Sequence, residues 1–286
     1  MAQSERQAVE ALLRRHGFRL SKARGQNFLI DRGVPRAIAE ASGANETNGV
    51  LEIGPGIGAL SSELCRRAGK VVAVELDTAL PPILEETMAA FSNFSLVTGD
   101  VLGIDLAALS RERFAGLRPI VCANLPYHIP TPALTAILEA KCFESLTVLV
   151  QREVAQRVCA RPGTPAYGAF SVFMQYYTEP ELCFEVPPEK FLPAPKVTSA
   201  VLRAAVRAVP PVEVADEAFF FRVVYAAFAL RRKTLVNSLT TSFGALGKAR
   251  LAELAASCGL AENVRGEWLG LEEFARLAAA LWEAEA

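Results

Sequence analysis

The sequence contains no uncharged apolar run of eighteen residues, the length from which a transmembrane helix is suspected. Residues 1–15 are polar and charged, and they lack the apolar stretch of a secretory signal peptide. We therefore expect a cytoplasmic protein that makes no contact with a membrane.

The cysteine pattern gives no sign of a metal site. The six cysteines stand at positions 65, 122, 142, 159, 183 and 258, and no two of them form a C-x-x-C pair. Spacing this wide and irregular argues against zinc, and a disulfide framework is improbable in a cytosolic chain of this length. We expect the cysteines to be small core residues and the protein to need no metal.

The sequence also lacks an excess of charge of either sign, since its formal net charge is −1. The distribution of charge is less even. Arg231, Arg232 and Lys233 form one basic cluster, and a second lies within the first 36 residues: Arg6, Arg14, Arg15, Arg19, Lys22, Arg24, Arg32 and Arg36. Such clusters are either solvated faces or sites for phosphate, and composition alone leaves both interpretations open.

Strand and helix signals alternate through the first two thirds of the chain. A short helix with apolar residues at helical spacing opens it. Strands are predicted at 50–53, 71–75, 94–98, 119–124 and 146–150, and helices at 59–68, 79–90, 131–140 and from about 151. This order predicts an α/β domain with a parallel sheet covered by helices on both faces.

The end of the chain departs from this alternation. Strands predicted at 182–186 and 199–206 are separated by a proline-rich stretch too short for a crossover helix, so one strand should be antiparallel. Residues 208–211 resemble a linker, and apolar spacing after them predicts helices only. We expect a first domain over 1–208, in which 1–48 form a basic helix and a capping segment, and a small helical domain over 209–286.

A glycine-rich loop follows the first predicted strand of the sheet. Residues 50–53 run into Gly54-Pro55-Gly56-Ile57-Gly58 and then a helix, an arrangement that lets backbone approach a bound nucleotide closely. Glu75 ends the next strand, where a carboxylate can accept hydrogen bonds from ribose hydroxyls. Asp100 follows the third strand and could accept one from an adenine amino group. The loop also satisfies a relaxed dinucleotide fingerprint, so it separates nicotinamide enzymes from methyltransferases poorly.

The tetrapeptide Asn124-Leu125-Pro126-Tyr127 follows the fourth predicted strand, at the sheet edge where ligands bind. An aryl amine is a weak nucleophile because its lone pair is delocalised. The Asn124 side-chain oxygen and a nearby backbone carbonyl could hold both amine hydrogens and aim the lone pair at an electrophilic methyl. Pro126 would stiffen the turn, and Tyr127 would offer a flat face to the base. The alternative is an ordinary turn, in which Asn and Pro are common.

With these residues in place, the sequence resembles the ribosomal RNA adenine N6,N6-dimethyltransferase family, in its small-subunit branch. The resemblance covers nearly the whole chain, in this order: GQNFL at 25–29, EIGPGIG at 52–58, VELD at 74–77, GD at 99–100, NLPY at 124–127, AYGAFSV at 166–172, EVPPEKFLPAPKVTSAV at 185–201 and FALRRKTLVNSL at 228–239.

The resemblance implies a Rossmann-like, class I methyltransferase domain with a mostly parallel seven-stranded sheet, one antiparallel strand and a helical C-terminal domain. It implies S-adenosylmethionine as cofactor, S-adenosylhomocysteine as product, catalysis by residues 124–127, and stacking of the target adenine on Phe191. The implied cofactor contacts are Gln26, Asn27, Leu29, Gly54, Gly56, Glu75, Leu76, Asp100, Val101 and Asn124. The basic cluster of Arg231, Arg232 and Lys233 is itself predicted to bind RNA phosphates.

The implied activity is dimethylation of N6 on two adjacent adenines, in a loop near the 3′ end of small-subunit (16S) ribosomal RNA. The enzyme is expected to act as a monomer on an assembling 30S-type particle. His128 and Pro130 depart from the residues that are commoner in the family after NLPY. The rival interpretations are a methyltransferase of large-subunit RNA that confers antibiotic resistance, a non-enzymatic assembly or transcription factor on the same fold, and, remotely, a nicotinamide dehydrogenase.

Overall fold

The structure is a computed structural model that describes residues 2–20 and 26–285. Lys22 and Arg24 of the N-terminal basic cluster, and Gly25 of the GQNFL motif, lie outside the described residues.

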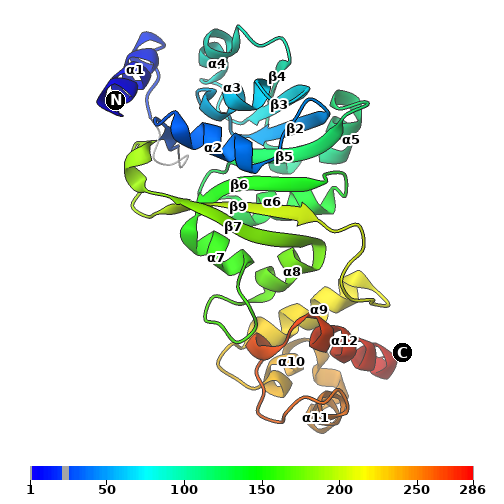
Figure 1. Ribbon diagram of the computed structural model, residues 1–286. Coiled ribbons are helices and arrows are strands. Elements are labelled where there is room, and N and C mark those ends of the chain that lie inside the picture. The colour runs from blue at the N-terminus through cyan, green and yellow to red at the C-terminus, as the bar shows by residue number, and fades with distance from the viewer. Residues whose placement is uncertain (1, 21–25, 286) are drawn as a thin grey trace. The chain divides into compact units, whose positions relative to one another are not determined.

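A seven-stranded sheet forms the centre of the first part of the chain, in the order β4-β3-β2-β5-β6-β9-β7 (Figure 1). Its strands are β2 (Asn48–Ile53), β3 (Lys70–Glu75), β4 (Phe94–Thr98), β5 (Arg118–Asn124), β6 (Ser145–Gln151), β7 (Thr178–Val186) and β9 (Ser199–Val206). Neighbours from β4 to β6 are parallel, and β9 runs antiparallel to β6, with Val148 opposite Leu202. The mostly parallel sheet with a reversed strand near its end is confirmed.

Helices connect these strands, and those at 59–65, 81–88, 130–139 and 152–158 match the predicted helices, whereas those at 33–41 and 106–113 were not predicted. They are α2 (Gly33–Ala41), α3 (Ala59–Cys65), α4 (Pro81–Met88), α5 (Leu106–Arg113), α6 (Pro130–Glu139) and α7 (Arg152–Val158), and α1 (Ala2–Arg15) opens the chain. Residues Val50, Val71 and Cys122 of the sheet are fully buried in one core with Ile38 of α2 and Leu64 of α3. Burial of continuous apolar strands is what a parallel sheet beneath helices requires.

A second, two-stranded sheet joins distant parts of the sequence. In it β1 (Phe28–Leu29) pairs antiparallel with β8 (Phe191–Leu192), so Leu29 lies opposite Phe191. Both strands are buried, and the pairing anchors the segment that follows residue 25 to the core of the sheet domain.

The chain divides into two compact units, Met1–Ala155 with Pro180–Val206, and Gln156–Glu179 with Arg207–Ala286. The second unit contains α8 (Ala169–Tyr177), α9 (Glu217–Ala229), α10 (Leu235–Phe243), α11 (Lys248–Ser257) and α12 (Leu271–Glu285), with the 3₁₀ turn η5 (Gly266–Trp268). The helical character of the C-terminal region is as expected. The expected domains, 1–208 and 209–286, remain a prediction. The compact units are drawn differently, because residues 156–179 pack with the C-terminal helices.

Aromatic rings hold the second unit together. Tyr176 of α8 stacks on Phe220 of α9 with ring centroids 5.2 Å apart, and Phe173 lies 5.4 Å from Phe221. The Asp216 carboxylate accepts a hydrogen bond from the Phe219 amide at 2.7 Å and so caps α9. Along the described residues, no helix combines the length and apolarity that a membrane crossing needs.

Candidate functional site

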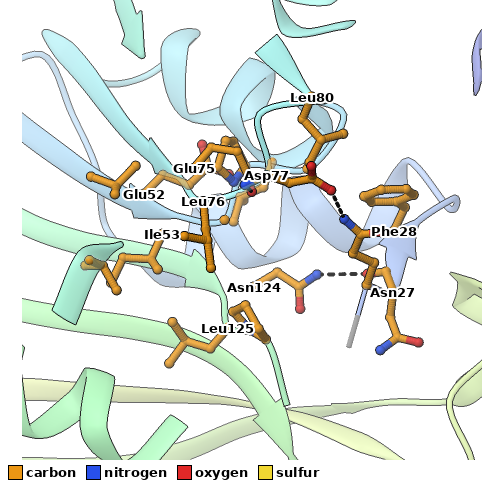
Figure 2. A pocket seen from close by; sticks show the side chains of 18 of the residues that line it. Asn27, Phe28, Glu52, Ile53, Glu75, Leu76, Asp77, Leu80, Asn124 and Leu125 are labelled. Atoms are coloured by element: carbon orange, nitrogen blue, oxygen red, sulfur yellow. Dashed lines mark hydrogen bonds between the residues drawn. The ribbon is translucent and has the colours of Figure 1, made fainter. Parts of the chain in front are cut away.

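A pocket lies at the carboxyl ends of β2, β3, β4 and β5, wholly within the first unit (Figure 2). Most of the residues singled out from the sequence line it. They are Gln26, Asn27, Leu29, Gly54, Gly56, Glu75, Leu76, Asp100, Val101, Asn124, Leu125, Pro126 and Tyr127. The topology explains this gathering, because parallel neighbours bring their carboxyl ends to one edge.

The glycine loop adopts a backbone that side chains would disturb. Gly54 has φ +67° and Gly56 has φ +58°, both in the left-handed region. A Cβ at Gly56 would come 2.9 Å from Cδ1 of Phe28, which lines the same pocket. The Gly54 amide donates to the Val74 carbonyl at 2.9 Å, so the loop is tied to the neighbouring strand. The glycines therefore bring bare backbone to the pocket wall.

Glu75 ends β3 as a buried carboxylate that backbone amides hold in place. The amide of Asp77 donates to its Oε1 at 2.8 Å, and the amides of Gly56 and Leu76 also lie within its reach. Burial raises the pKa of Glu75, and the backbone donors oppose that rise. An acceptor fixed in this way at the edge of a pocket suits a ligand with neighbouring hydroxyl groups.

Asp77 is a pocket residue to which the sequence analysis gave no role. Its buried carboxylate accepts from Nε2 of Gln26 at 2.7 Å and from the amide of Ala79 at 3.1 Å. The hydrogen bond from Gln26, drawn as a dashed line at Asp77 in Figure 2, ties the segment after residue 25 to the end of β3. The motif VELD carried the signal, since an acid two residues beyond Glu75 shares its sheet edge.

Asp100 follows β4 and differs from Glu75 in being exposed. Its Oδ1 accepts from the amide of Leu102 at 3.0 Å and begins a short 3₁₀ turn, Val101–Gly103. Leu76 also lines the pocket, with 60% of its surface exposed. An open apolar side chain beside an exposed carboxylate is an arrangement suited to a heteroaromatic ring with an amino group.

Glu52 is the second acid that the sequence analysis left without a role. It lies in β2 on the pocket wall with 1% of its surface exposed. Desolvation raises the pKa of this carboxyl to about 8, and the Glu75 charge adds to the rise. Among the described residues its Oε2 has no hydrogen-bond partner. A buried carboxyl oxygen without a partner is costly, and on a pocket wall it can meet a polar group of a ligand.

Asn124 stands at the end of β5 with its amide oriented by a backbone carbonyl. Its Nδ2 donates to the Asn27 carbonyl at 3.2 Å, as the dashed line in Figure 2 shows. A carbonyl can only accept, so the nitrogen must face it and the Asn124 oxygen is left for another donor. The structure thus joins the GQNFL and NLPY motifs, which lie 97 residues apart in the sequence.

The rest of the NLPY segment is held firmly. Leu125 is buried, and its amide donates to the Leu149 carbonyl at 3.1 Å. Pro126 packs close to Gly54, and the Tyr127 hydroxyl hydrogen-bonds with the Ser199 hydroxyl. Burial raises the pKa of Tyr127, which therefore stays a neutral phenol. The ring and the turn are positioned by contacts on both sides.

Phe191, on which the target adenine was expected to stack, does not line the pocket. It is 1% exposed, belongs to the core and is absent from the pocket lining that the structure describes. Its β8 strand pairs with β1, and this pairing turns the ring into the core beside Leu29.

The two basic clusters differ in their pairing. In the N-terminal cluster Arg6 contacts Glu10 at 2.9 Å, Arg36 contacts Glu40 at 2.9 Å, and Arg15 pairs with Glu86. In the second unit Arg231, Arg232 and Lys233 are all exposed. Only Arg231 of these three has a side-chain contact within the described part of the chain: its guanidinium lies 3.4 Å from Glu267 and also donates to the Pro165 carbonyl.

Comparisons with known proteins show to which family the chain belongs. The family model described as "Ribosomal RNA adenine dimethylase" matches residues 17–279. The chain belongs to the ribosomal RNA adenine dimethylase family. It is 46% identical to the protein named "Ribosomal RNA small subunit methyltransferase A" of Shouchella clausii (strain KSM-K16), over 96% of this chain and 94% of that protein. Its namesake in Lactococcus lactis subsp. lactis (strain IL1403) is 44% identical over the same shares.

Solved structures agree on the fold of this dimethylase family member. The crystal structure of the 23S rRNA methyltransferase ErmE matches with a TM-score of 0.67 and 27% identity, over 89% of this chain and 99% of that one. A dimethyladenosine transferase from Plasmodium falciparum matches with a TM-score of 0.74 at 19% identity, over 89% and 97%. The expected Rossmann-like methyltransferase fold is confirmed. Within the described residues no group of three or more His, Cys, Asp or Glu is placed to hold a metal ion.

Proposed function

We propose that this dimethylase transfers methyl groups from S-adenosylmethionine to N6 of two adjacent adenines, near the 3′ end of small-subunit ribosomal RNA. The observation that carries the proposal is the Asn124 amide, held by the Asn27 carbonyl at 3.2 Å with its oxygen available at the wall of the glycine-loop pocket. The names of the relatives that are 44–46% identical support small-subunit RNA as the substrate.

The residues present fit S-adenosylmethionine. A Cβ at Gly56 would fill part of the pocket, so the loop leaves room for a ligand against its backbone. The Oε2 atom of Glu52, which has no hydrogen-bond partner among the described residues, is available to a polar group of the ligand. Glu75 would hold the ribose, Asp100 with Val101 and Leu76 would hold the adenine, and Gln26, Asn27, Leu29, Gly54 and Asn124 would complete the contacts. When bound, the cofactor supplies an electrophilic methyl group.

Asn124 would accept a hydrogen from the target amine and so fix the direction of its lone pair. Because the amine is neutral and needs little help to lose a proton once methylated, positioning is the main contribution and no strong base is required. Tyr127, fixed by Ser199, would support the plane of the base, and Leu125 and Pro126 would keep the turn rigid. We assign stacking to Tyr127 first, since Phe191 would have to leave the core to meet a base.

The target adenine must be unpaired or flipped out, because a base paired through N6 cannot present that amine. In this proposal the exposed Arg231, Arg232 and Lys233 bind RNA phosphates, which position the substrate without reading its sequence. The protein acts in the cytoplasm as a monomer on an assembling 30S-type particle, and S-adenosylhomocysteine is released.

The test is transfer of radiolabelled methyl groups to small ribosomal subunits from a strain that lacks this protein. Four methyl groups per particle, mapped by primer extension to two adjacent adenines, are expected. The similarity to ErmE makes large-subunit RNA the second candidate. In a parallel assay with large-subunit RNA, modification of one adenine there and none in the small subunits would establish that candidate. An inactive protein that still binds small subunits would establish a non-enzymatic assembly factor.

A further inference from the structure

Trp268 in η5 is the more exposed of the two tryptophans in the chain. Its exposed fraction is 61%, against 43% for Trp282, which packs edge-on against Phe219 with centroids 4.9 Å apart. Among the described residues, Trp268 makes no contact with another aromatic ring. An exposed indole offers a large, flat apolar surface that a flat ligand could cover.

The Trp268 ring rests on backbone. A Cβ at Gly163, where φ is +82°, would come 2.6 Å from Cζ3 of the indole. The Gly163 amide donates to the Glu267 carbonyl at 2.7 Å, and the Tyr167 hydroxyl donates to the Leu269 carbonyl at 2.9 Å. The loop beneath the ring is therefore fixed to both neighbours of Trp268. The six-membered ring of the indole lies against Gly163, while 61% of the residue stays exposed.

Basic side chains gather at the residue that precedes Trp268. The Glu267 carboxylate contacts Arg231 at 3.4 Å and Arg265 at 3.9 Å, so one acid holds two guanidinium groups beside Trp268. Arg232 and Lys233 continue the exposed cluster. Glu273 is a further acid close by, and Arg276 pairs with it at 3.2 Å. Together these residues are five cations and two acids, and all of them belong to the second unit.

We propose that Trp268, supported by Gly163 and flanked by Arg231 and Arg265, is a stacking platform for one unpaired base of the RNA substrate. This inference rests on the proposed function. An indole face accepts any base, while the neighbouring cations take the phosphates on either side. The occupant is single-stranded RNA, since bases in a duplex already stack on each other, and a second copy of this basic surface would repel the first.

Fluorescence tests the platform directly because the chain has two tryptophans. In the full-length variant Trp282→Phe, Trp268 is the only indole. Single-stranded oligoadenylate should quench its emission on saturation, and an abasic oligomer of the same length and charge should not. Equal quenching by both oligomers, or none at saturation, would overturn the platform. A blue shift that grows with protein concentration alone would place a second copy there and would also overturn it.

Binding separates stacking from charge. Trp268→Leu should weaken binding of small subunits about tenfold, the effect of losing one base–aromatic stack. Its KM for subunits should rise with kcat unchanged, and the salt dependence of binding should keep its slope. Trp268→Phe should recover most of the affinity. The matched control is Trp282→Leu, which removes the other exposed indole and should leave subunit affinity unchanged.

The outcome also distinguishes this inference from the proposed function. If the wild type methylates small subunits while Trp268→Leu matches it in KM and affinity, the platform is wrong and the function stands. If the wild type transfers no methyl groups but Trp268 is quenched by bases only, the surface binds RNA and the proposed reaction is wrong.

Discussion

The pocket of the first unit and the basic surface of the second hold their polar side chains differently. Glu75, Asp77 and Asn124 are each fixed by a backbone group, at 2.8, 3.1 and 3.2 Å. Arg232 and Lys233 are exposed, and no side-chain contact holds either within the described residues. Fixed groups can distinguish one geometry from another, whereas exposed charges act on a phosphate chain at any sequence. Substitutions in the pocket should therefore change methyl transfer or cofactor affinity, whereas substitutions on the basic surface should change RNA binding.

The largest effect should come from Asn124→Ala. Without the amide oxygen the target amine is free to rotate, and turnover should fall on the order of 10²-fold or more. Single-turnover methyl transfer with both substrates saturating measures this loss. RNA affinity should persist, because phosphate contacts dominate it.

If Asn124→Ala retained near wild-type turnover, the NLPY segment would be an ordinary turn with no catalytic role. Cofactor calorimetry serves as the control, since a modest loss of affinity is compatible with the model of an oriented amide and a complete loss is not. An inactive variant that still binds subunits should also remain on them longer than the wild type.

Glu75→Ala should act on cofactor affinity in place of turnover. Two hydrogen bonds to a charged acceptor would be lost, each worth roughly 1.5–3 kcal/mol, so affinity should fall on the order of 10²-fold or more. Calorimetry with S-adenosylmethionine measures this. Asp100→Ala should cost less, because that carboxylate is exposed and one hydrogen bond is at stake. Equal losses from both variants would contradict the contrast between fixed and open acceptors.

Glu52→Gln should change stability in a pH-dependent way. The folded-state pKa of about 8 lies above the unfolded value near 4.5, so the folded state holds a proton that the unfolded state releases. The stability contribution of the protonated acid is complete below about pH 4.5 and is lost as pH rises to about 8. As pH rises from 5 to 8, the free energy of unfolding of the variant should increase relative to that of the wild type by about 2 kcal/mol or more, since each pKa unit corresponds to about 1.4 kcal/mol.

Urea unfolding of both proteins at each pH gives the Glu52→Gln comparison, in which contributions from other groups cancel. A difference that is constant with pH would show that the wild-type carboxyl is already ionised at pH 5 when folded, and that a neighbouring group stabilises its charge.

The sequence predicted the sheet and most of the pocket because both follow from local rules. Alternating strands and helices require parallel neighbours, and Glu75, Asp100 and Asn124 each end a strand, so their meeting at one edge needs only the topology. The role of Glu52 was harder to predict, since an acid with 1% of its surface exposed is recognised only once the tertiary packing is known. Phe191 and Trp268 were harder still. The inward orientation of Phe191 depends on the β1–β8 pairing, and the placement of the Trp268 ring depends on contact with a loop about 100 residues away in sequence.

Neutralising Arg232 and Lys233 together should give a smaller effect, seen only in RNA binding. Each lost phosphate contact should lower the slope of log affinity against log salt by roughly 0.7–0.9, and cofactor affinity should not change. Filter binding of small subunits over a range of salt concentrations measures the slope. An unaltered slope would make this cluster a solvated face and would remove the contrast with the pocket.

The smallest effect is expected from Arg6→Ala combined with Arg36→Ala. Each arginine already pairs with an acid one helical turn away, at 2.9 Å from Glu10 and from Glu40, so a phosphate would have to displace a local partner. Exposed pairs of this kind contribute little to stability, and the variant should fold as the wild type does. In the same filter-binding titration its salt slope should equal that of the wild type. A fall as large as that from Arg232 and Lys233 would show that pairing does not separate the two basic clusters, and that α1 and α2 also bind the RNA backbone.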